Sequence, residues 1–174
     1  INVSSYIKLI IFILVLLSIS GAILFIDSSM DNINKTMPDI SNSIVDGDND
    51  YNEAVKLVND KYFDESLNKA KSAGDNFNES LNKLKNIRDK FSSDINDVQK
   101  EYIDTVVQEL ELKIDAVDNL INAIECFKVY SNSTGTSYAS QANELMYEAT
   151  MYQHERDEIV NNNTELFKPQ KFML

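Results

Sequence analysis

The sequence predicts an all-α protein in which an N-terminal apolar helix leads into an elongated, acidic helical bundle. The first supporting observation is that the chain of 174 residues contains only two prolines and four glycines, which disfavours turn-rich β folds. The second is a repeat of apolar residues at intervals of seven, which is typical of helices packed side by side. The third is an uncharged apolar run at Leu9–Ile26, which has the length of a membrane-spanning helix.

The run Leu9–Ile26 predicts that residues 1–27 form a membrane anchor helix, with the lipid bilayer as its partner. It contains eighteen uncharged residues, more than the 7–15 apolar residues of an ordinary signal peptide, so an uncleaved anchor is favoured. Lys8 precedes the run, whereas Asp27 and Asp31 follow it. This flanking charge predicts a single-pass protein of the cell membrane, with its N-terminus inside and its acidic domain outside.

Residues 28–49 are predicted to form a juxtamembrane linker, because they contain Pro38, Gly47 and many Ser, Asn and Asp residues. Asp50 and Glu53 have the spacing of a helix capping box, which predicts that the first bundle helix begins there. The segment Asp46–Asp50 has carboxylates on alternate residues, as a calcium loop has. Tyr51 and Leu57 then stand where that loop needs Gly and Glu, so the pattern favours a linker and cap over a metal site.

An internal repeat predicts the first bundle helix, over residues 50–91. The segment 63–69 (FDESLNK) recurs fourteen residues later as 77–83 (FNESLNK), and two heptads return a helix to the same face. The predicted seam residues of this helix are Phe63, Ala70, Phe77, Leu84 and Phe91, flanked by Leu67, Leu81, Ile87 and Ile95.

Two further seams predict helices over 95–130 and 137–163, so that residues 50–163 form an antiparallel, coiled-coil-like bundle of three helices. The second seam comprises Ile103, Leu110, Val117 and Ile124, interleaved with Val107, Ile114 and Ile121. The third comprises Tyr138, Leu145, Tyr152 and Ile159, interleaved with Ala142 and Ala149. Met146, Tyr147 and Met151 have helical spacing, which favours core or edge packing over a ligand pocket.

The sequence evidence for the breaks between these helices is stronger at one break than at the other. Residues 131–136 are small and polar and predict a loop. Ser92–Asp94 allows either a turn or a continuous helix of some 60 residues, and we favour the turn because Ser and Asp compete for backbone hydrogen bonds. Residues 164–174 form a C-terminal tail that either packs locally or docks on another molecule.

No catalytic, cofactor-binding or metal-binding constellation can be identified, so an enzyme is not expected. His154 lies near Glu155 and Glu158 but has no second His or Cys, which favours a surface hydrogen bond over a zinc site. Cys126 is the only cysteine and is expected to be a small buried hydrophobe. The remaining Asp and Glu residues are expected on solvated helix faces.

Glycosylation sequons, which fit an exterior domain, occur at Asn2, Asn34, Asn78, Asn132 and Asn162.

Three resemblances bear on this prediction. The segment Phe63–Leu67, followed by Ala73, resembles the second-helix half of a tetratricopeptide repeat, although Glu53 and Ala54 depart from the first-helix half. The Asn-, Lys-, Ile- and Asp-rich composition and the anchor-plus-bundle layout are similar to uncharacterised membrane proteins of methanogenic archaea. Ile1–Ile26 resembles the N-terminal helix of type IV pilins and archaellins, which packs in a filament core, although Ser5 replaces their usual Glu and Lys8 would lie in that core.

These observations favour a non-enzymatic, membrane-anchored extracytoplasmic bundle that acts through protein contacts, as a scaffold, an accessory subunit or a homo-oligomer. The part of the chain after the anchor carries a formal charge of −13, which disfavours nucleic-acid binding. Two alternatives stay open. The first is a pilin-like subunit of an extracellular filament, and the second is a sensor-type ectodomain that binds a small ligand between its helices.

Overall fold

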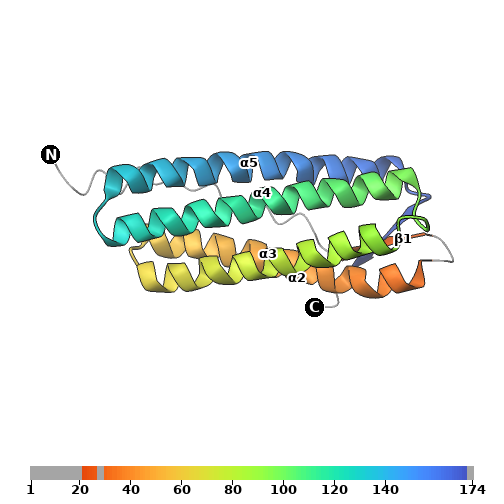
Figure 1. Ribbon diagram of the computed structural model, residues 1–174, viewed down its shortest axis with the longest axis horizontal. Helices are drawn as coiled ribbons and strands as arrows, with labels where there is room; N and C mark the ends of the chain where they lie inside the picture. Colours follow the sequence, from red (N-terminus) through yellow and green to blue (C-terminus); the bar gives the residue numbers. More distant parts are fainter. Residues whose placement is uncertain (1–20, 27–29, 172–174) are drawn as a thin grey trace.

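The protein is an all-helical bundle with a short two-stranded sheet at one end, as seen in the computed structural model (Figure 1). The structure describes residues 21–26 and 30–171. Four helices, α2 (Asp31–Asn59), α3 (Phe63–Lys90), α4 (Asp97–Lys128) and α5 (Asn132–Asn162), run alternately up and down the bundle. The all-α prediction is confirmed, but the described part of the chain has four bundle helices and not three.

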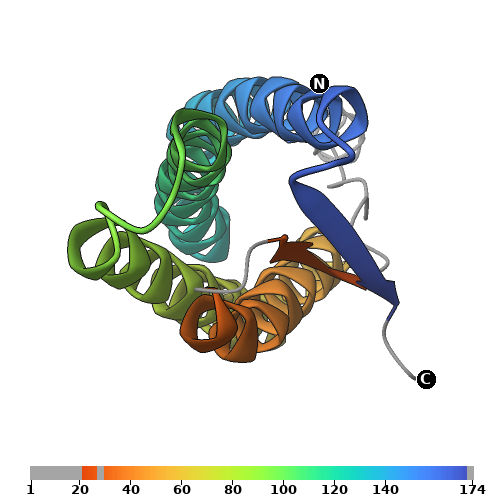
Figure 2. The ribbon, with the colours of Figure 1, turned by 90° about the vertical axis from the view of Figure 1, so that its right-hand side faces the viewer.

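The helices form a curved row in which each packs mainly against the next along the chain. Viewed from its end, the row has α2 and α5 at its two extremes, and the sheet lies between them (Figure 2). The sheet pairs β1 (Gly21–Phe25) with β2 (Phe167–Lys171) in antiparallel fashion, so that Phe25 is opposite Phe167. Segments from the two ends of the described chain therefore meet at one end of the bundle, called here the sheet end.

The predicted linker 28–49 is wrong, because most of it belongs to α2. The apolar residues of this segment follow a helical spacing and are buried: Ile33, Met37, Ile40 and Ile44. Pro38 lies inside the helix and removes a backbone donor, which costs about 3 kcal/mol in a helix interior. Burial of one complete face of α2 outweighs that cost. Asp50 is consequently an interior helix residue and not a cap, and its carboxylate accepts hydrogen bonds from Ser72 and Asn76 of α3.

The predicted single helix 50–91 is also wrong, because a turn at residues 60–62 separates α2 from α3. Lys61 has a backbone φ of 65°, the left-handed conformation that ends a helix. A matching turn joins α4 to α5, where Tyr130 has a φ of 61°. The two turns lie together at the end of the bundle opposite the sheet (Figure 1), called here the turn end. Neither turn contains the Gly that usually marks such a position in a sequence.

The predicted loop 131–136 is mostly the first turns of α5, which begins at Asn132. Gly135 is buried there against Phe127, and a Cβ atom at Gly135 would lie 2.6 Å from that ring. The small residues that suggested a loop thus allow α5 to approach α4 closely. Between α3 and α4 the favoured turn is present, and Asn96 and Gln99 form a reciprocal capping box at the start of α4.

Most predicted seam residues of α3 and α4 are buried, including Phe77, Leu84, Ile103 and Leu110. The α5 seam is confirmed in part: Ala142, Ala149 and Ile159 are buried as predicted, whereas Tyr138, Leu145 and Tyr152 are half-buried. The row that faces the core comprises Gly135, Ala139, Ala142, Met146, Ala149, Gln153 and Arg156. The prediction favoured the large apolar residues, whereas the close approach to α4 requires small ones.

The predicted anchor Leu9–Ile26 is not supported as one continuous helix. Its last residues form β1, and Phe25 is buried in the core. Residues 9–20 lie outside the described residues. Among the helices that the structure describes, none combines the length and the apolar character needed to cross a membrane. The C-terminal tail packs locally as β2, because Phe167 joins the same core.

A buried charge network as candidate functional site

Four charged side chains lie in the middle of the bundle and form the central charge network: Asp48, Glu109, Lys113 and Arg156. Asp48 comes from α2, Glu109 and Lys113 from successive turns of α4, and Arg156 from α5. Their side chains are at most 4% exposed. Two carboxylates and two cations make the network neutral when all four are ionised.

Short contacts connect the four groups in a row. Lys113 Nζ donates to Asp48 Oδ1 at 2.8 Å and lies 2.8 Å from Glu109 Oε2. The Arg156 guanidinium donates from Nε to Glu109 Oε1 and from Nη2 to Glu109 Oε2. The network thus links α2, α4 and α5. Charge-assisted hydrogen bonds of this kind are about twice as strong as neutral ones, and they fix the relative position of the helices that carry them.

Phe77 of α3 covers the network from the remaining side. Lys113 Nζ lies 5.6 Å from the centre of the Phe77 ring, close enough for a cation–π contact. The ring fits because Gly47 has no side chain: a Cβ atom at Gly47 would lie 2.5 Å from Phe77 Cε1. Gly47 and Asp48 therefore act together, the first admitting the ring and the second binding the ammonium group.

The electrostatics keep the network charged near neutral pH. Burial raises the pKa of Asp48 to about 6, although the Lys113 ammonium opposes this shift. Burial also favours the neutral form of Glu109, but the charges of Arg156 and Lys113 outweigh it and lower the Glu109 pKa. Burial likewise opposes the charge of Lys113, but Glu109 and Asp48 outweigh it and raise the Lys113 pKa. The neighbouring charges thus stabilise the charged forms of Glu109 and Lys113, whereas at Asp48 burial outweighs the neighbouring ammonium.

The network approaches the sheet end through Tyr102. Burial raises the pKa of Tyr102 to about 12, and the nearby charge of Arg156 opposes that shift. The Tyr102 ring packs against Phe25 of β1 and Phe167 of β2, with centroid distances of 6.0 and 5.2 Å. These three rings form the sheet-end aromatic cluster. It joins the paired strands to α4.

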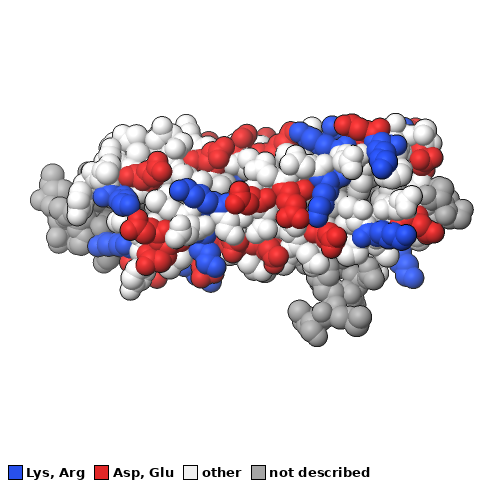
Figure 3. Space-filling model, turned by 60° about the horizontal axis from the view of Figure 1, so that its bottom comes forward, with Lys and Arg blue, Asp and Glu red and all other residues white. Residues whose placement is uncertain are grey.

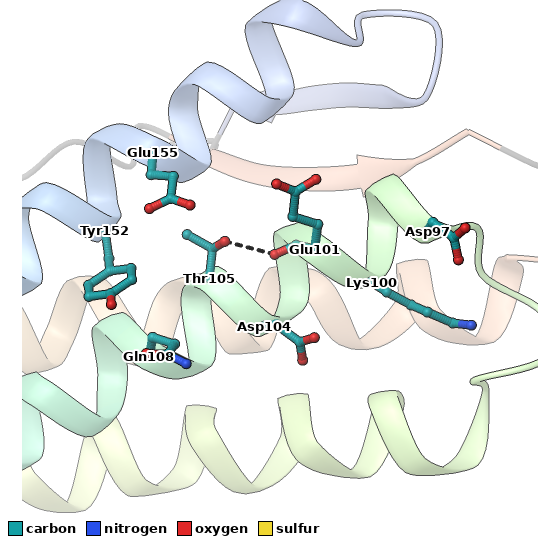
Figure 4. A pocket seen from close by; sticks show the side chains of 8 residues that line it. All are labelled: Asp97, Lys100, Glu101, Asp104, Thr105, Gln108, Tyr152 and Glu155. Carbon is teal, nitrogen blue, oxygen red and sulfur yellow. Dashed lines mark hydrogen bonds between the residues drawn. The ribbon is translucent and has the colours of Figure 1, made fainter.

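The described surface pockets are separate from this network. One lies between α4 and α5, has a volume of about 360 Å³ and is lined largely by acidic and polar side chains (Figure 4): Asp97, Lys100, Glu101, Asp104, Thr105, Gln108, Tyr152 and Glu155. The other, of similar volume, lies between α2 and α3. Neither is lined by a residue of the network, so the buried charges are closed to a substrate entering through them. Within residues 21–26 and 30–171, no group of three carboxylate, His or Cys side chains could hold a metal ion.

The sequons occupy different environments. Asn34 is half-buried, and its side-chain amide exchanges two hydrogen bonds with the backbone of Phe25, so a glycan there would displace both. Asn78 is exposed on α3, and Asn132 and Asn162 are the first and last residues of α5. Asn2 lies outside the described residues. Glycosylation at these positions stays a prediction.

The cysteine, the Met and Tyr residues and the histidine considered in the sequence analysis lie in different environments. Cys126 is half-buried. Met146 is in the core, whereas Tyr147 and Met151 are 62% and 57% exposed, so of the predicted core or edge packing the core applies to Met146 and not to Tyr147 or Met151. His154 and Glu158 are exposed on α5.

Sequence reasoning missed the central charge network because it assigned acidic residues to solvated faces. The positions of these charged residues in the sequence nevertheless indicate that they are buried. Each charged residue continues a row of buried residues spaced by seven: Ser41, Asp48, Val55; Tyr102, Glu109, Ala116, Ala123; Val106, Lys113, Leu120, Phe127; Ala142, Ala149, Arg156. A charge at a seam position of a bundle is a candidate for a buried pair.

Family models, curated proteins and solved structures were all compared with the chain, and none of them matches it.

Proposed function

We propose that this chain is a non-enzymatic helical-bundle protein that is attached to a membrane at its sheet end and acts through protein–protein contacts. The observation that carries the proposal is the position of the large exposed apolar side chains. Tyr62, Val129 and Tyr130 lie at the turn end and are 57%, 70% and 88% exposed. Tyr147 and Met151 lie on the outer part of α5. Exposed aromatic and Met side chains of this kind are enriched at protein interfaces.

The attachment is proposed from the order of the chain. The apolar residues Leu9–Ser20 lead directly into β1 at the sheet end. A helix of 29 residues such as α2 is about 44 Å long, so the turn end would stand about that far from the membrane. With the bundle attached at its sheet end, the turn end would be presented to other proteins.

The surface supports contacts with proteins more than with nucleic acids. On the face shown in Figure 3, acidic and basic side chains are interspersed and no continuous basic stripe is seen. Several surface lysines pair with carboxylates, as Lys85 does with Glu111 at 2.9 Å and Lys83 with Glu79 at 2.8 Å. The net charge of −12 repels a nucleic-acid backbone.

Flotation with lipid vesicles tests the attachment. The full chain is expected to float with vesicles and to resist extraction by alkaline carbonate. Changing Leu14 and Leu17 to Asp adds two charges to the apolar run, each costing about 3 kcal/mol in a bilayer, and should abolish flotation. A matched variant with Tyr62→Asp and Tyr130→Asp adds the same charge at the turn end and should float normally. Equal flotation of both variants, or recovery of the protein in sheared extracellular fibres, would contradict the proposal.

A further inference from the structure

The internal repeat of α3 sets two groups of polar side chains against α2, fourteen residues apart. In the first group, three α3 side chains surround the carboxylate of Asp50 on α2. Ser72 Oγ donates to Asp50 Oδ2 at 2.6 Å, and Asn76 Nδ2 donates to the same oxygen at 3.2 Å. Lys69 Nζ lies 3.8 Å from Asp50 Oδ1. A hydroxyl, an amide and an ammonium group thus share one carboxylate that the chain itself supplies.

In the second group, the equivalent positions line the surface pocket between α2 and α3. Fourteen residues further along α3 they are Lys83, Asn86 and Lys90, and all three line this pocket. Because α2 runs antiparallel to α3, the equivalent of Asp50 lies fourteen residues earlier on α2, at Thr36, which also lines the pocket (Figure 1). No Asp or Glu is among the described residues that line it. The pocket therefore has the donors of the Asp50 site without its carboxylate.

The pocket is also more positive than the Asp50 site. In each, the first lysine pairs with a glutamate at the surface, at 3.3 Å for Lys69 and 2.8 Å for Lys83, so these pairs do not distinguish the two. The differences are the loss of the Asp50 carboxylate and the replacement of Asn76 by Lys90. Together they add two positive charges in a chain whose net charge is −12.

We propose that this pocket binds a small anion of the phosphate class, in the place that the Asp50 carboxylate holds in the first repeat. A phosphate group carries a charge of about −1.5 to −2 at pH 7 and three strong acceptor oxygens. It matches two ammonium groups and an amide better than a carboxylate, which has one charge and two oxygens. The pocket volume of about 360 Å³ lies within the range of small-ligand sites.

The polar groups of the pocket can turn to such a ligand at small cost. Within the described part of the chain, no hydrogen bond or ion pair crosses the pocket from Thr36 to the three α3 side chains. The Thr36 hydroxyl donates to the Asn32 carbonyl at 3.3 Å, which is long for an O–H···O bond. The contact of Lys83 with Glu79 lies near the surface and contributes little. Lys90 has no carboxylate within 4 Å among the described residues, and its Nζ lies 5.6 Å from the centre of the neighbouring Phe91 ring.

The position of the pocket suggests a source for the phosphate. Thr36 is in the second turn of α2 and Lys90 is the last residue of α3, so the pocket lies at the sheet end. Ile87 and Phe91 add apolar surface to its lining. The proposed function places the sheet end at a membrane, and if it holds, the ligand is the phosphate of a lipid headgroup. A free phosphate has the same chemistry, so the test uses both.

Titration calorimetry of the full chain in maltoside detergent tests the pocket, at pH 7 and constant ionic strength. The two probes are sodium phosphate and dihexanoyl phosphatidic acid. One site per chain is expected, and Lys83→Gln and Lys90→Gln should each weaken binding at least about fivefold. Lys71→Gln removes the same charge from an exposed position of α3 outside the pocket and should leave binding unchanged. Binding of neither probe, or an equal loss in all three variants, would overturn the proposal.

A second pair of variants tests the equivalence with Asp50. Thr36→Asp supplies the carboxylate of the first repeat, so it should weaken binding of both probes about tenfold or more without lowering the midpoint of thermal unfolding. Thr36→Asn has nearly the same shape without the charge and should bind within about twofold of the unaltered chain. Equal binding by these two variants would contradict the inference.

The two probes also distinguish the sources. Phosphatidic acid that binds at least about fivefold more tightly than phosphate would support the lipid headgroup, whereas equal or weaker binding would refute the lipid and leave the free anion. The titration uses no membrane, so its result is separate from vesicle flotation. Binding without flotation would refute only the proposed attachment, and flotation without binding would refute only this inference.

Discussion

The central charge network and the sheet-end aromatic cluster are both buried, but different forces hold them. The network contains three ion pairs whose attraction must offset the loss of water around four charges. The cluster contains three rings with centroids 5.2 to 6.0 Å apart. Burying these rings is favourable and, unlike burying a charge, does not require a partner of opposite charge at a defined position. The network therefore specifies which helices meet and in which register, and the cluster supplies stability at the end where the strands pair.

The largest expected effect is from removing one member of the network. Lys113→Met leaves Asp48 and Glu109 with a single buried cation, and the free energy of unfolding should fall by about 3–5 kcal/mol, measured by urea denaturation. Lys83→Met removes an exposed lysine with the same spacing to its Glu and should cost about 0.5 kcal/mol or less. The double variant with Asp48→Leu restores charge balance and should recover at least half of the loss. Equal effects of the two lysine changes would show that the network is not a coupled unit.

Removing a ring from the aromatic cluster should cost less. Phe25→Ala deletes a side chain that is 2% exposed and contacts both other rings, with an expected loss of about 3 kcal/mol. Because no charge is involved, the loss should be the same at low and high salt and between about pH 5 and 7. Leu24→Ala, at a half-buried neighbour, serves as the smaller control. A loss that varied strongly with pH would mean that the cluster and the network are not independent.

The pH dependence distinguishes the two regions directly. The pKa of Asp48 is about 6 in the folded protein, against an ordinary value of 3.8, so the folded state binds more protons between these values. The contribution of Asp48 to stability therefore decreases as the pH rises from about 4 to about 6, by up to about 3 kcal/mol. Glu109 has a lowered pKa, and its contribution is lost in the opposite direction, as the pH falls below about 4.5.

Denaturation of the unaltered chain and of Asp48→Asn across this range separates the two contributions. The difference in unfolding free energy between them should change by up to about 3 kcal/mol in the direction that favours Asp48→Asn at the higher pH. Phe25→Ala should show no such trend relative to the unaltered chain. A difference that stayed constant with pH would show that Asp48 is not buried as described.

The smallest expected effect on the free energy of unfolding is from adding a side chain at Gly47, beside the network. Gly47→Ala places a Cβ atom 2.5 Å from the Phe77 ring, and the displaced ring should cost about 1–2 kcal/mol despite the better helix propensity of Ala. At Gly74 the nearest atom to such a Cβ is Val117 Cγ1 at 3.3 Å, so Gly74→Ala should be neutral or slightly stabilising. If Gly47→Ala stabilised the protein as much as Gly74→Ala, the close packing of Phe77 would be refuted.

Much of the fold could be predicted from the local repeat of apolar residues along the sequence. Helix α4 was predicted as 95–130 and is Asp97–Lys128, because its apolar residues repeat regularly and Asn96 caps its start. The all-α class follows from the same periodicity. The turn between α2 and α3 could not be predicted, since Lys61 adopts a left-handed backbone conformation without a Gly to signal it. Pro38 and the small polar residues near Gly135 looked like breaks, and burial of their helices overrode them.

What the sequence determined by itself is the helical periodicity, because a helix is built from residues within a few positions of one another. Only the tertiary structure decided that Gly21–Phe25 leaves the apolar run to pair with Phe167–Lys171, and that Asp48, Lys113, Glu109 and Arg156 meet in the core. These contacts join residues far apart along the chain. Whether a charge lies in water or in a core depends on which partner the other helices bring to it, and that partner is not visible in the residue's own surroundings.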